Sequence, residues 1–259
     1  MCFELDSAPP IPTIAGAAIS HTDLVLEAAD GNRLAGFLAS PDRPAGVGMV
    51  VFPDVRGLYH FYEELALRFA ERGIASLAFD YFGRTAGVEK RGEEFDWMPH
   101  VQQTTDDGVQ ADAHAAVDRL RAEGCGTIFT VGFCFGGRAS WIAAASNHGL
   151  AGAIGFYGHP TRQGMGADAG SSAADRAAAM TCPVLALQAG IDENITPEAN
   201  AAFERALADA GVEHELLTYE GSPHSFFDRK YEEHADASAD AWRRTLAFVE
   251  AHSDWRERS

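Results

Sequence analysis

The sequence has 259 residues, a length that suits one large α/β domain better than two small domains. Its 38 acidic and 20 basic residues give a formal net charge of -18, which argues against nucleic acid or an anionic membrane surface as a partner, because both require a basic face. No apolar run approaches the ~20 residues that span a bilayer. The N-terminus lacks the basic and apolar regions of a signal peptide.

The cysteine and histidine content indicates a protein of a reducing compartment without a metal site. The four cysteines are Cys2, Cys125, Cys134 and Cys182, and they contain no CxxC pair and no disulfide framework. Several histidines are scattered along the chain without ligand spacing: His21, His60, His100, His114 and His148. We therefore expect a cytoplasmic protein with no metal and no cofactor.

The chain is expected to begin with an extended arm, residues 1–21, because its three closely spaced prolines cannot continue a helix. The remaining residues, 22–259, are expected to form one domain. Two short candidate strands, 22–28 and 33–39, open this domain. Asp-Gly between them, at positions 30 and 31, is a hairpin signal.

From residue 48 onward, buried strands alternate with amphipathic helices. The expected strands are 49–52, 74–79, 127–131, 150–157, 183–188 and 212–219. The expected helices are 61–72, 105–123, 136–147, 197–210 and 235–252. This alternation predicts an α/β fold with a mostly parallel sheet covered on both faces. The Gly- and Ala-rich stretch 160–180 is expected to be a loop or small insertion near the C-terminal edge of the sheet, where chemistry is found in such folds.

The most informative motif is Gly132-Phe-Cys134-Phe-Gly136-Gly137, which follows a β-branched strand and precedes a helix. This is the nucleophile-elbow pattern with Cys in place of Ser. The glycines are needed because the sharp strand-to-helix turn leaves no room for side chains, and the helix N-terminus favours a thiolate. A dinucleotide-binding loop needs Gly-x-Gly-x-x-Gly, which this spacing does not supply. A buried cysteine on a tight turn is the other alternative.

Two further residues complete a candidate triad with Cys134. Asp192 ends the Gly-Ile-Asp sequence that closes the strand segment beginning at residue 183, and His224 lies in the loop after the strand 212–219. Taken alone, Asp192 could cap the following helix, and a single loop histidine is often only solvated. The order nucleophile, acid, histidine is that of the α/β-hydrolases, with each residue placed after a predicted strand.

These motifs resemble the dienelactone hydrolase family of the α/β-hydrolase fold, over roughly residues 22–252. The similarity rests on the three triad segments, on Phe52-Pro-Asp-Val-Arg-Gly57 and on Asp80-Tyr-Phe-Gly-Arg84. It implies that Cys134 is the nucleophile, Asp192 the orienting acid and His224 the base. In this fold, backbone N–H groups form the oxyanion hole, which predicts Phe135 and Val55 as the two donors.

Several substrate-site assignments also follow from the resemblance. The family commonly has Glu before the second oxyanion donor, where it activates the thiol, and here Asp54 is one methylene shorter. Family members that act on dienelactone hold the substrate carboxylate with two arginines, and Arg84 matches one of them. At the position expected for the other stands Asp228, with Arg229 one residue later. Three aromatic residues are expected to wall an apolar pocket or to belong to the core: Phe82, Trp97 and Tyr157.

The sequence therefore predicts an enzyme, a dienelactone hydrolase-like carboxylic ester hydrolase. Its expected reaction is hydrolysis of a small ester or lactone by the Cys-His-Asp triad through an acyl-thioester. The first alternative is a broad carboxylesterase or thioesterase of the same fold, which Asp228 favours and Arg84 disfavours. The second is a non-enzymatic protein that uses Cys134 as an oxidisable sensor thiol. A sensor needs neither Asp192 nor His224. The expected partner is a small-molecule substrate.

Overall fold

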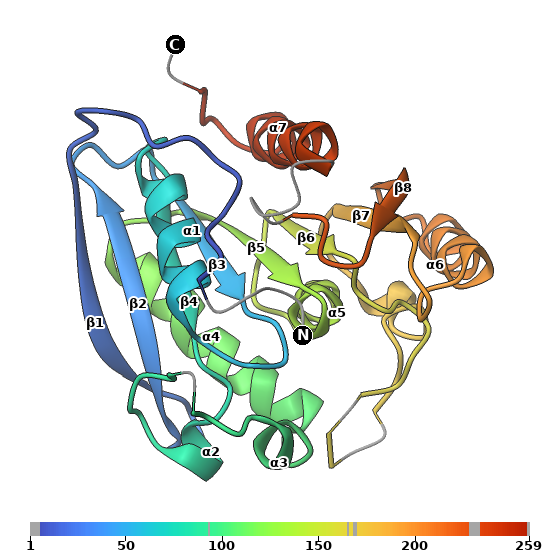
Figure 1. Cartoon of the computed structure of the whole chain (residues 1–259), viewed down its shortest axis with the longest axis horizontal. Coiled ribbons are helices and arrows are strands. Elements are labelled where there is room, and N and C mark those ends of the chain that lie inside the picture. The colour runs from blue at the N-terminus through green and yellow to red at the C-terminus, as the bar shows by residue number, and fades with distance from the viewer. Residues whose placement is uncertain (1–5, 93, 165, 168–169, 228–233, 258–259) are drawn as a thin grey trace.

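An eight-stranded sheet forms the centre of the computed structural model, which describes residues 6–92, 94–164, 166–167, 170–227 and 234–257 (Figure 1). The strand order is β1-β2-β4-β3-β5-β6-β7-β8. β1 and β2 pair antiparallel, as do β2 and β4, and all other neighbours are parallel. The strands are β1 (Ile19–Glu27), β2 (Arg33–Pro41), β3 (Val47–Phe52), β4 (Ala75–Phe79), β5 (Thr127–Phe133), β6 (Gly152–Phe156), β7 (Val184–Ile191) and β8 (His214–Pro223).

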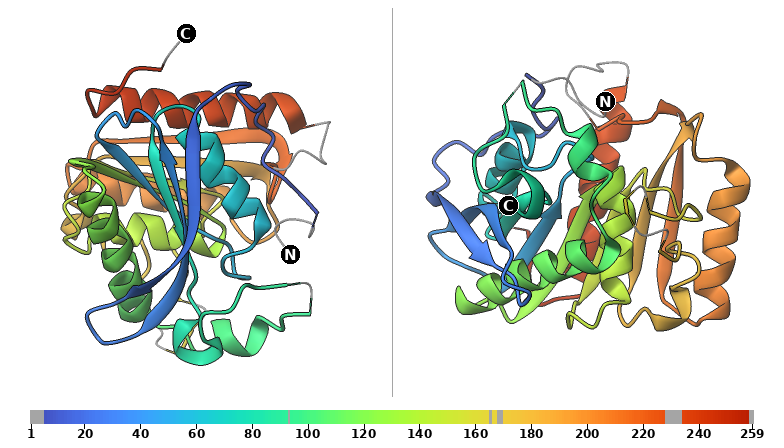
Figure 2. Two further views of the ribbon diagram at one scale, coloured as in Figure 1. Left: turned by 90° about the vertical axis from the view of Figure 1, so that its left-hand side faces the viewer. Right: turned by 90° about the horizontal axis from the view of Figure 1, so that it is seen from below.

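Helices cover both faces of this sheet, as the sequence predicts. They are α1 (His60–Ala70), α2 (Gly83–Ala86), α3 (Met98–Val101), α4 (Asp106–Ala122), α5 (Phe135–Ala144), α6 (Pro197–Asp209) and α7 (Ala235–Ala251), with a 3-10 turn, η1, at Ala177–Ala179. The two views in Figure 2 show the sheet between the helix layers, with α1 and α7 on one side and α4 and α5 on the other. None of the helices in the described part of the chain is both long and apolar enough to cross a bilayer.

The strand residues alternate between two cores, as the period of two in a strand requires. In β3, Met49 and Val51 pack with the helices α1 and α7, whereas Val50 and Phe52 pack against α4. All four side chains are fully buried. A strand that is buried on both faces has a continuous apolar sequence, which explains why β3 could be predicted from the sequence.

Three differences from the sequence predictions concern local structure. β1 begins at Ile19, so residues 19–21, expected in the arm, pair with β2. The short helices α2 and α3 are not predicted, because four residues give no helical periodicity. The stretch 160–180 is largely irregular in its described part and contains η1. Its first residues lie beside the helix of the elbow, where Nε of Arg138 donates to the carbonyl of Arg162 at 3.0 Å.

The parallel strands bring three loops to one edge of the sheet. β5 and β7 both pair with β6, and β8 pairs with β7. Cys134 follows β5, Asp192 follows β7 and His224 follows β8. Residues that are 32 to 90 positions apart in the chain are thereby collected at the carboxyl ends of neighbouring strands, where α/β folds place their binding sites.

Candidate active site

Cys134 occupies the sharp turn between β5 and α5, with φ 56° and ψ -112°. A Cβ atom at Gly132 would lie 1.9 Å from the carbonyl oxygen of Gly136, and one at Gly136 would lie 2.2 Å from that of Phe52. Only glycine fits these two positions, as the motif predicts. The turn leaves Cys134 partly exposed at the N-terminal end of α5.

His224 and Asp192 form a direct hydrogen bond, 2.5 Å between Nδ1 and Oδ2. The other carboxylate oxygen, Oδ1, accepts from the backbone N–H groups of Asn194 at 2.9 Å and Ile195 at 3.3 Å. Burial alone would raise the pKa of Asp192, but the hydrogen bond and charge of His224 and the two backbone donors outweigh it and lower the pKa. An ionised carboxylate can only accept, so Nδ1 of His224 is the donor in this hydrogen bond.

A pocket of about 170 Å³ contains both Cys134 and His224. Its lining is Cys134, Phe135, Arg138, Tyr157, His159, Arg162, Gln163, Asn194, Ile195 and His224. The ring of Tyr157, which is buried, lies 4.9 Å from the imidazole of His224 between centroids. Of the aromatic residues that the sequence offers as pocket walls, Tyr157 is the one found here.

The loop after β3 approaches the same end of α5. A Cβ atom at Gly136 would lie 2.2 Å from the carbonyl oxygen of Pro53, so the two backbones are in close contact. Val55 lies in the tight turn that follows, which is closed by the 3.1 Å hydrogen bond from the N–H of Gly57 to the carbonyl of Asp54. Phe135 is the first residue of α5. The two expected oxyanion donors therefore belong to segments that pack against each other.

Asp54 is fully buried and faces Arg56. One carboxylate oxygen accepts from Nη2 of Arg56 at 2.8 Å, and the other accepts from its backbone N–H at 2.9 Å. Burial opposes the charge of Arg56, but the carboxylate of Asp54 raises the pKa of the guanidinium well above its usual range. The carboxylate of Asp54, which the sequence predicts as an activator of the thiol, therefore forms an ion pair with Arg56.

Tyr81 is a residue of this region that the sequence analysis missed. Its hydroxyl donates to the carbonyl of Pro53 at 2.7 Å, and its ring meets that of Phe135 edge-on at 5.1 Å. Burial, and then the nearby Asp54, Asp80 and Cys134, raise its pKa well above the usual value. Tyr81 therefore stays protonated and holds the β3 loop against the elbow.

The structure does not bring Arg84, Phe82 or Trp97 to the pocket of Cys134. Arg84 turns toward α4, where it pairs with Asp112, and Phe82 is fully buried in the core under α4. Trp97 packs partly buried against the same core. The residues Asp228 and Arg229 lie outside the described residues.

Arg138, His159 and Arg162 are pocket residues that the sequence analysis also missed. Arg138 had one usable signal, since it is the only charged side chain in the apolar helix α5. The N–H of Arg162 donates to Nδ1 of His159 at 3.1 Å. Burial and then the charge of Arg162 lower the pKa of His159.

The remaining described cysteines have a different character from Cys134. Cys125 and Cys182 are both buried, and burial raises their pKa to about 11 and about 12. Neither thiol ionises near neutral pH. Within the described ranges, no three or more His, Cys, Asp or Glu side chains are grouped so that they could hold a metal ion.

The comparisons with known proteins agree with this architecture. The model of the dienelactone hydrolase family matches residues 34–253. The carboxymethylenebutenolidase of Rhodococcus opacus is 27% identical over 97% of each chain. A Klebsiella pneumoniae structure assigned to the dienelactone hydrolases superposes with a TM-score of 0.78 at 24% identity, over 89% of this chain and 98% of that one. A dienelactone hydrolase-like phosphotriesterase from metagenomic libraries gives 0.73 at 23% identity, over 91% and 99%. This chain thus belongs to the dienelactone hydrolase family and is a carboxylic ester hydrolase with the α/β-hydrolase fold.

Proposed function

We propose that the protein hydrolyses a small ester or lactone by covalent catalysis, with Cys134 as nucleophile, His224 as base and Asp192 as the acid that orients it. The observation that carries this proposal is the 2.5 Å hydrogen bond between His224 and Asp192, together with the position of His224 in the pocket that Cys134 also lines. An imidazole held by a carboxylate beside a nucleophile is the arrangement that acyl transfer requires.

The proposed first half-reaction makes a thioester. Nε2 of His224 takes the proton of the Cys134 thiol, and the sulfur attacks the ester carbonyl carbon. The carbonyl oxygen gains the negative charge and is stabilised by the N–H groups of Phe135 and Val55. When the tetrahedral intermediate collapses, the C–O bond breaks and the leaving oxygen receives the proton from His224. In a lactone, the leaving oxygen remains tethered to the acyl group.

The second half-reaction returns the enzyme to its starting state. Nε2 of His224 removes a proton from a water molecule, which attacks the thioester carbonyl. The C–S bond breaks, and the thiolate of Cys134 recovers the proton from the imidazolium. Asp192 remains ionised throughout and stabilises the imidazolium, because its pKa is held below the usual value.

For the substrate, we propose a carboxylate-bearing lactone that is held by Arg162. This side chain is exposed at the pocket and forms no ion pair in the described part of the chain, whereas the guanidinium of Arg138 is occupied by Asp106. A net charge of -18 repels anions at long range, so an anionic substrate needs such a local cation. A broad carboxylesterase or thioesterase is the second candidate, favoured by the absence of Arg84 from the pocket.

The test compares hydrolysis of a dienelactone and of a neutral aryl ester by the wild type, Cys134→Ala, Arg162→Ala and Arg205→Ala. Cys134→Ala is expected to lose both activities. Arg162→Ala is expected to raise KM for the dienelactone by about tenfold and to leave the neutral ester unchanged. Arg205, exposed on α6, is the matched control for net charge. Residual turnover by Cys134→Ala contradicts the nucleophile, and equal effects of Arg162→Ala on both substrates favour the broad esterase.

A further inference from the structure

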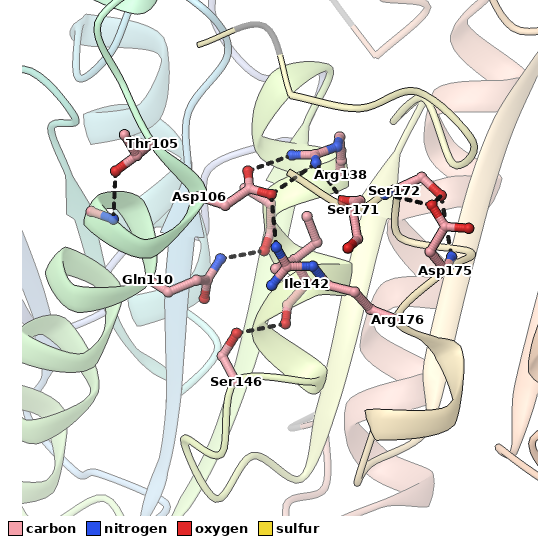
Figure 3. A network of polar contacts seen from close by, with 12 residues as sticks. Thr105, Asp106, Gln110, Arg138, Ile142, Ser146, Ser171, Ser172, Asp175 and Arg176 are labelled. Carbon is pink, nitrogen blue, oxygen red and sulfur yellow. Dashed lines mark hydrogen bonds and ion pairs between the residues drawn. The ribbon is translucent and has the colours of Figure 1, made fainter. Parts of the chain in front are cut away.

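A buried ion-pair cluster joins α4, α5 and the segment before β7 (Figure 3). Asp106, the first residue of α4, receives Nη1 of Arg138 at 2.7 Å and Nη2 at 2.9 Å, one on each carboxylate oxygen. Arg176 adds a third contact, 3.1 Å from its Nη2 to Oδ2. The side chains of Asp106 and Arg138 are 11% and 7% exposed. The bidentate geometry makes this a strong and directional pair.

Arg138 uses its remaining donors on the backbone of the segment that walls the active-site pocket. Nε donates to the carbonyl of Arg162 at 3.0 Å, and Nη2 also donates to the carbonyl of Ser171 at 2.9 Å. One guanidinium therefore holds two points that are nine residues apart. Arg162, at the first of these points, and Gln163, the next residue, line the pocket.

The same segment is fitted closely against the start of α4. The N–H of Ala167 donates to the carbonyl of Thr104 at 2.8 Å, and a Cβ atom at Gly166 would lie 1.8 Å from that carbonyl oxygen. A Cβ atom at Gly170 would lie 2.5 Å from Oδ2 of Asp106. The glycines of this stretch thus let the chain pass directly beside the carboxylate.

The cluster also sits one turn from the nucleophile. The backbone N–H of Arg138 donates to the carbonyl of Cys134 at 3.3 Å, as the first turn of α5. One turn after Asp106 in α4, Nε2 of Gln110 donates to the carbonyl of Ala139, the residue after Arg138 in α5, at 3.0 Å. This contact and the ion pair of Asp106 with Arg138 fix α4 relative to the first turns of α5, so the position of the wall is tied to the position of the thiol.

We infer that Asp106 is a positioning residue which, through Arg138 and Arg176, fixes the wall formed by residues 159–163 and so determines which substrates fit beside Cys134. This inference rests on the proposed function of the pocket. Asp106 is not among the residues that line the pocket. Its carboxylate binds Arg138, and Arg138 holds the carbonyl of Arg162. A shift of that carbonyl would move the side chains of the wall.

The test uses Asp106→Asn, with Asp107→Asn as the matched control, since Asp107 is an exposed neighbour in the same helical turn. Two series of aryl esters are compared, one with acyl groups from acetate to hexanoate and one with acetates of phenols of increasing size. Asp106→Asn is expected to keep kcat for the smallest ester and to raise KM for the largest member of one series by about tenfold. Asp107→Asn is expected to match the wild type. Equal losses for all esters, or an unchanged KM throughout, overturn the inference.

Two further measurements guard against simple misfolding. Arg176→Gln removes only the more exposed arm of the cluster, 26% exposed, and is expected to give a smaller effect with the same dependence on substrate size. Trypsin is expected to cut after Arg162 faster in Asp106→Asn than in Asp107→Asn, because the carbonyl of that peptide bond is held by Arg138. Equal cleavage rates contradict the clamp.

The failure of the inference and the failure of the proposed function have different signatures. If the wild type hydrolyses none of these esters, or if Cys134→Ala retains their hydrolysis, the proposed function fails and the role in substrate selection fails with it. If the wild type is active through Cys134 but Asp106→Asn loses activity uniformly, only the positioning role is overturned.

Discussion

Nη1 of Arg84 lies 2.6 Å from Oδ2 of Asp112, whose side chain has no exposed surface. The same guanidinium reaches Asp30 at 2.7 Å. Burial alone would lower the pKa of Arg84, yet the hydrogen bonds to Asp112 and Asp30 raise it. These contacts join the β1–β2 hairpin to α4, so in this structure Arg84 connects parts of the fold, and Arg162 takes its place as the candidate for binding a substrate carboxylate.

Arg84→Ala is accordingly expected to reduce stability without changing substrate preference. Removing the cation leaves Asp112 buried with Asn32, at 2.9 Å, as its one remaining side-chain partner among the described residues, which should lower the free energy of unfolding by roughly 2–4 kcal/mol. Urea denaturation measures this loss, and the ratio of kcat/KM for dienelactone and neutral ester should stay constant. A rise in KM confined to the dienelactone would support the original assignment of Arg84 to binding of the substrate carboxylate.

His224→Ala and Asp192→Asn are both expected to reduce kcat, with the larger effect for His224. In the proposed mechanism the imidazole moves the protons of both half-reactions, whereas the carboxylate fixes its tautomer and orientation, a role that is worth up to ~10⁴ in kcat in serine proteases. Steady-state hydrolysis of an aryl acetate measures both. Asp240→Asn, which alters a carboxylate that pairs with Arg244 on α7, is the control. If His224→Ala retains most of the rate, the assignment of the base is wrong.

Alkylation is expected to inactivate the enzyme at one thiol. Cys125 and Cys182 are buried, with a pKa of about 11 and about 12, so little thiolate is present at pH 7.5. Cys134 is partly exposed in the pocket. Peptide mapping after iodoacetamide treatment should find that the loss of activity follows the modification of Cys134, with Cys125 and Cys182 unmodified and any labelling of Cys2 without effect on activity. Activity that survives full modification of Cys134 would contradict the covalent mechanism.

His148 is expected to make the fold less stable at mildly acidic pH. Its Nε2 lies 3.0 Å from Oε1 of Gln110, and its Nδ1 lies 3.0 Å from Nδ1 of His114. Burial, and then the charges of His114 and Arg121, lower the pKa of His148 to about 4. In the unfolded chain the pKa is near 6.5, so the unfolded state binds the proton first. The contribution of this group is therefore complete above pH 7 and is lost as the pH falls toward 4.

Between pH 8 and pH 5 this linkage should remove about 2 kcal/mol from the free energy of unfolding. Urea denaturation at both pH values should show a correspondingly smaller decrease in His148→Gln than in the wild type. His60→Gln serves as the control, because the side chain of His60 is 62% exposed. The same decrease in His148→Gln and in the wild type would show that His148 does not titrate as described.

The elbow could be predicted because its information is local. β5 is β-branched and apolar, the glycines follow at fixed offsets, and α5 begins directly afterwards. The order of Cys134, Asp192 and His224 added the topology, since each lies where a strand ends. For these residues, the position in the chain predicts the position in space, because the carboxyl ends of parallel strands lie at the same edge of the sheet.

The pocket wall could not be predicted, because it depends on contacts between distant residues. Asp106 and Asp107 are adjacent acidic residues in the first turn of α4, a position where carboxylates are common for any helix. Only the packing of α4 on α5 decides which of them meets Arg138. Arg84 follows β4 as expected, but the short helix α2 turns its side chain toward Asp112.

The backbone conformation of Cys134 affects the free energy of unfolding of the protein. At φ 56° and ψ -112° a residue with a side chain is strained by on the order of 1–3 kcal/mol. Glycine reaches this conformation freely, although it loses about 0.5–1 kcal/mol more chain entropy on folding. Cys134→Gly should therefore be inactive and yet more resistant to urea than Cys134→Ala, which keeps the strained Cβ. The opposite ranking would show that the elbow is relaxed. By this reasoning, the natural sequence does not give its own backbone the highest possible free energy of unfolding. The residue that lowers this free energy is the one proposed to perform the reaction.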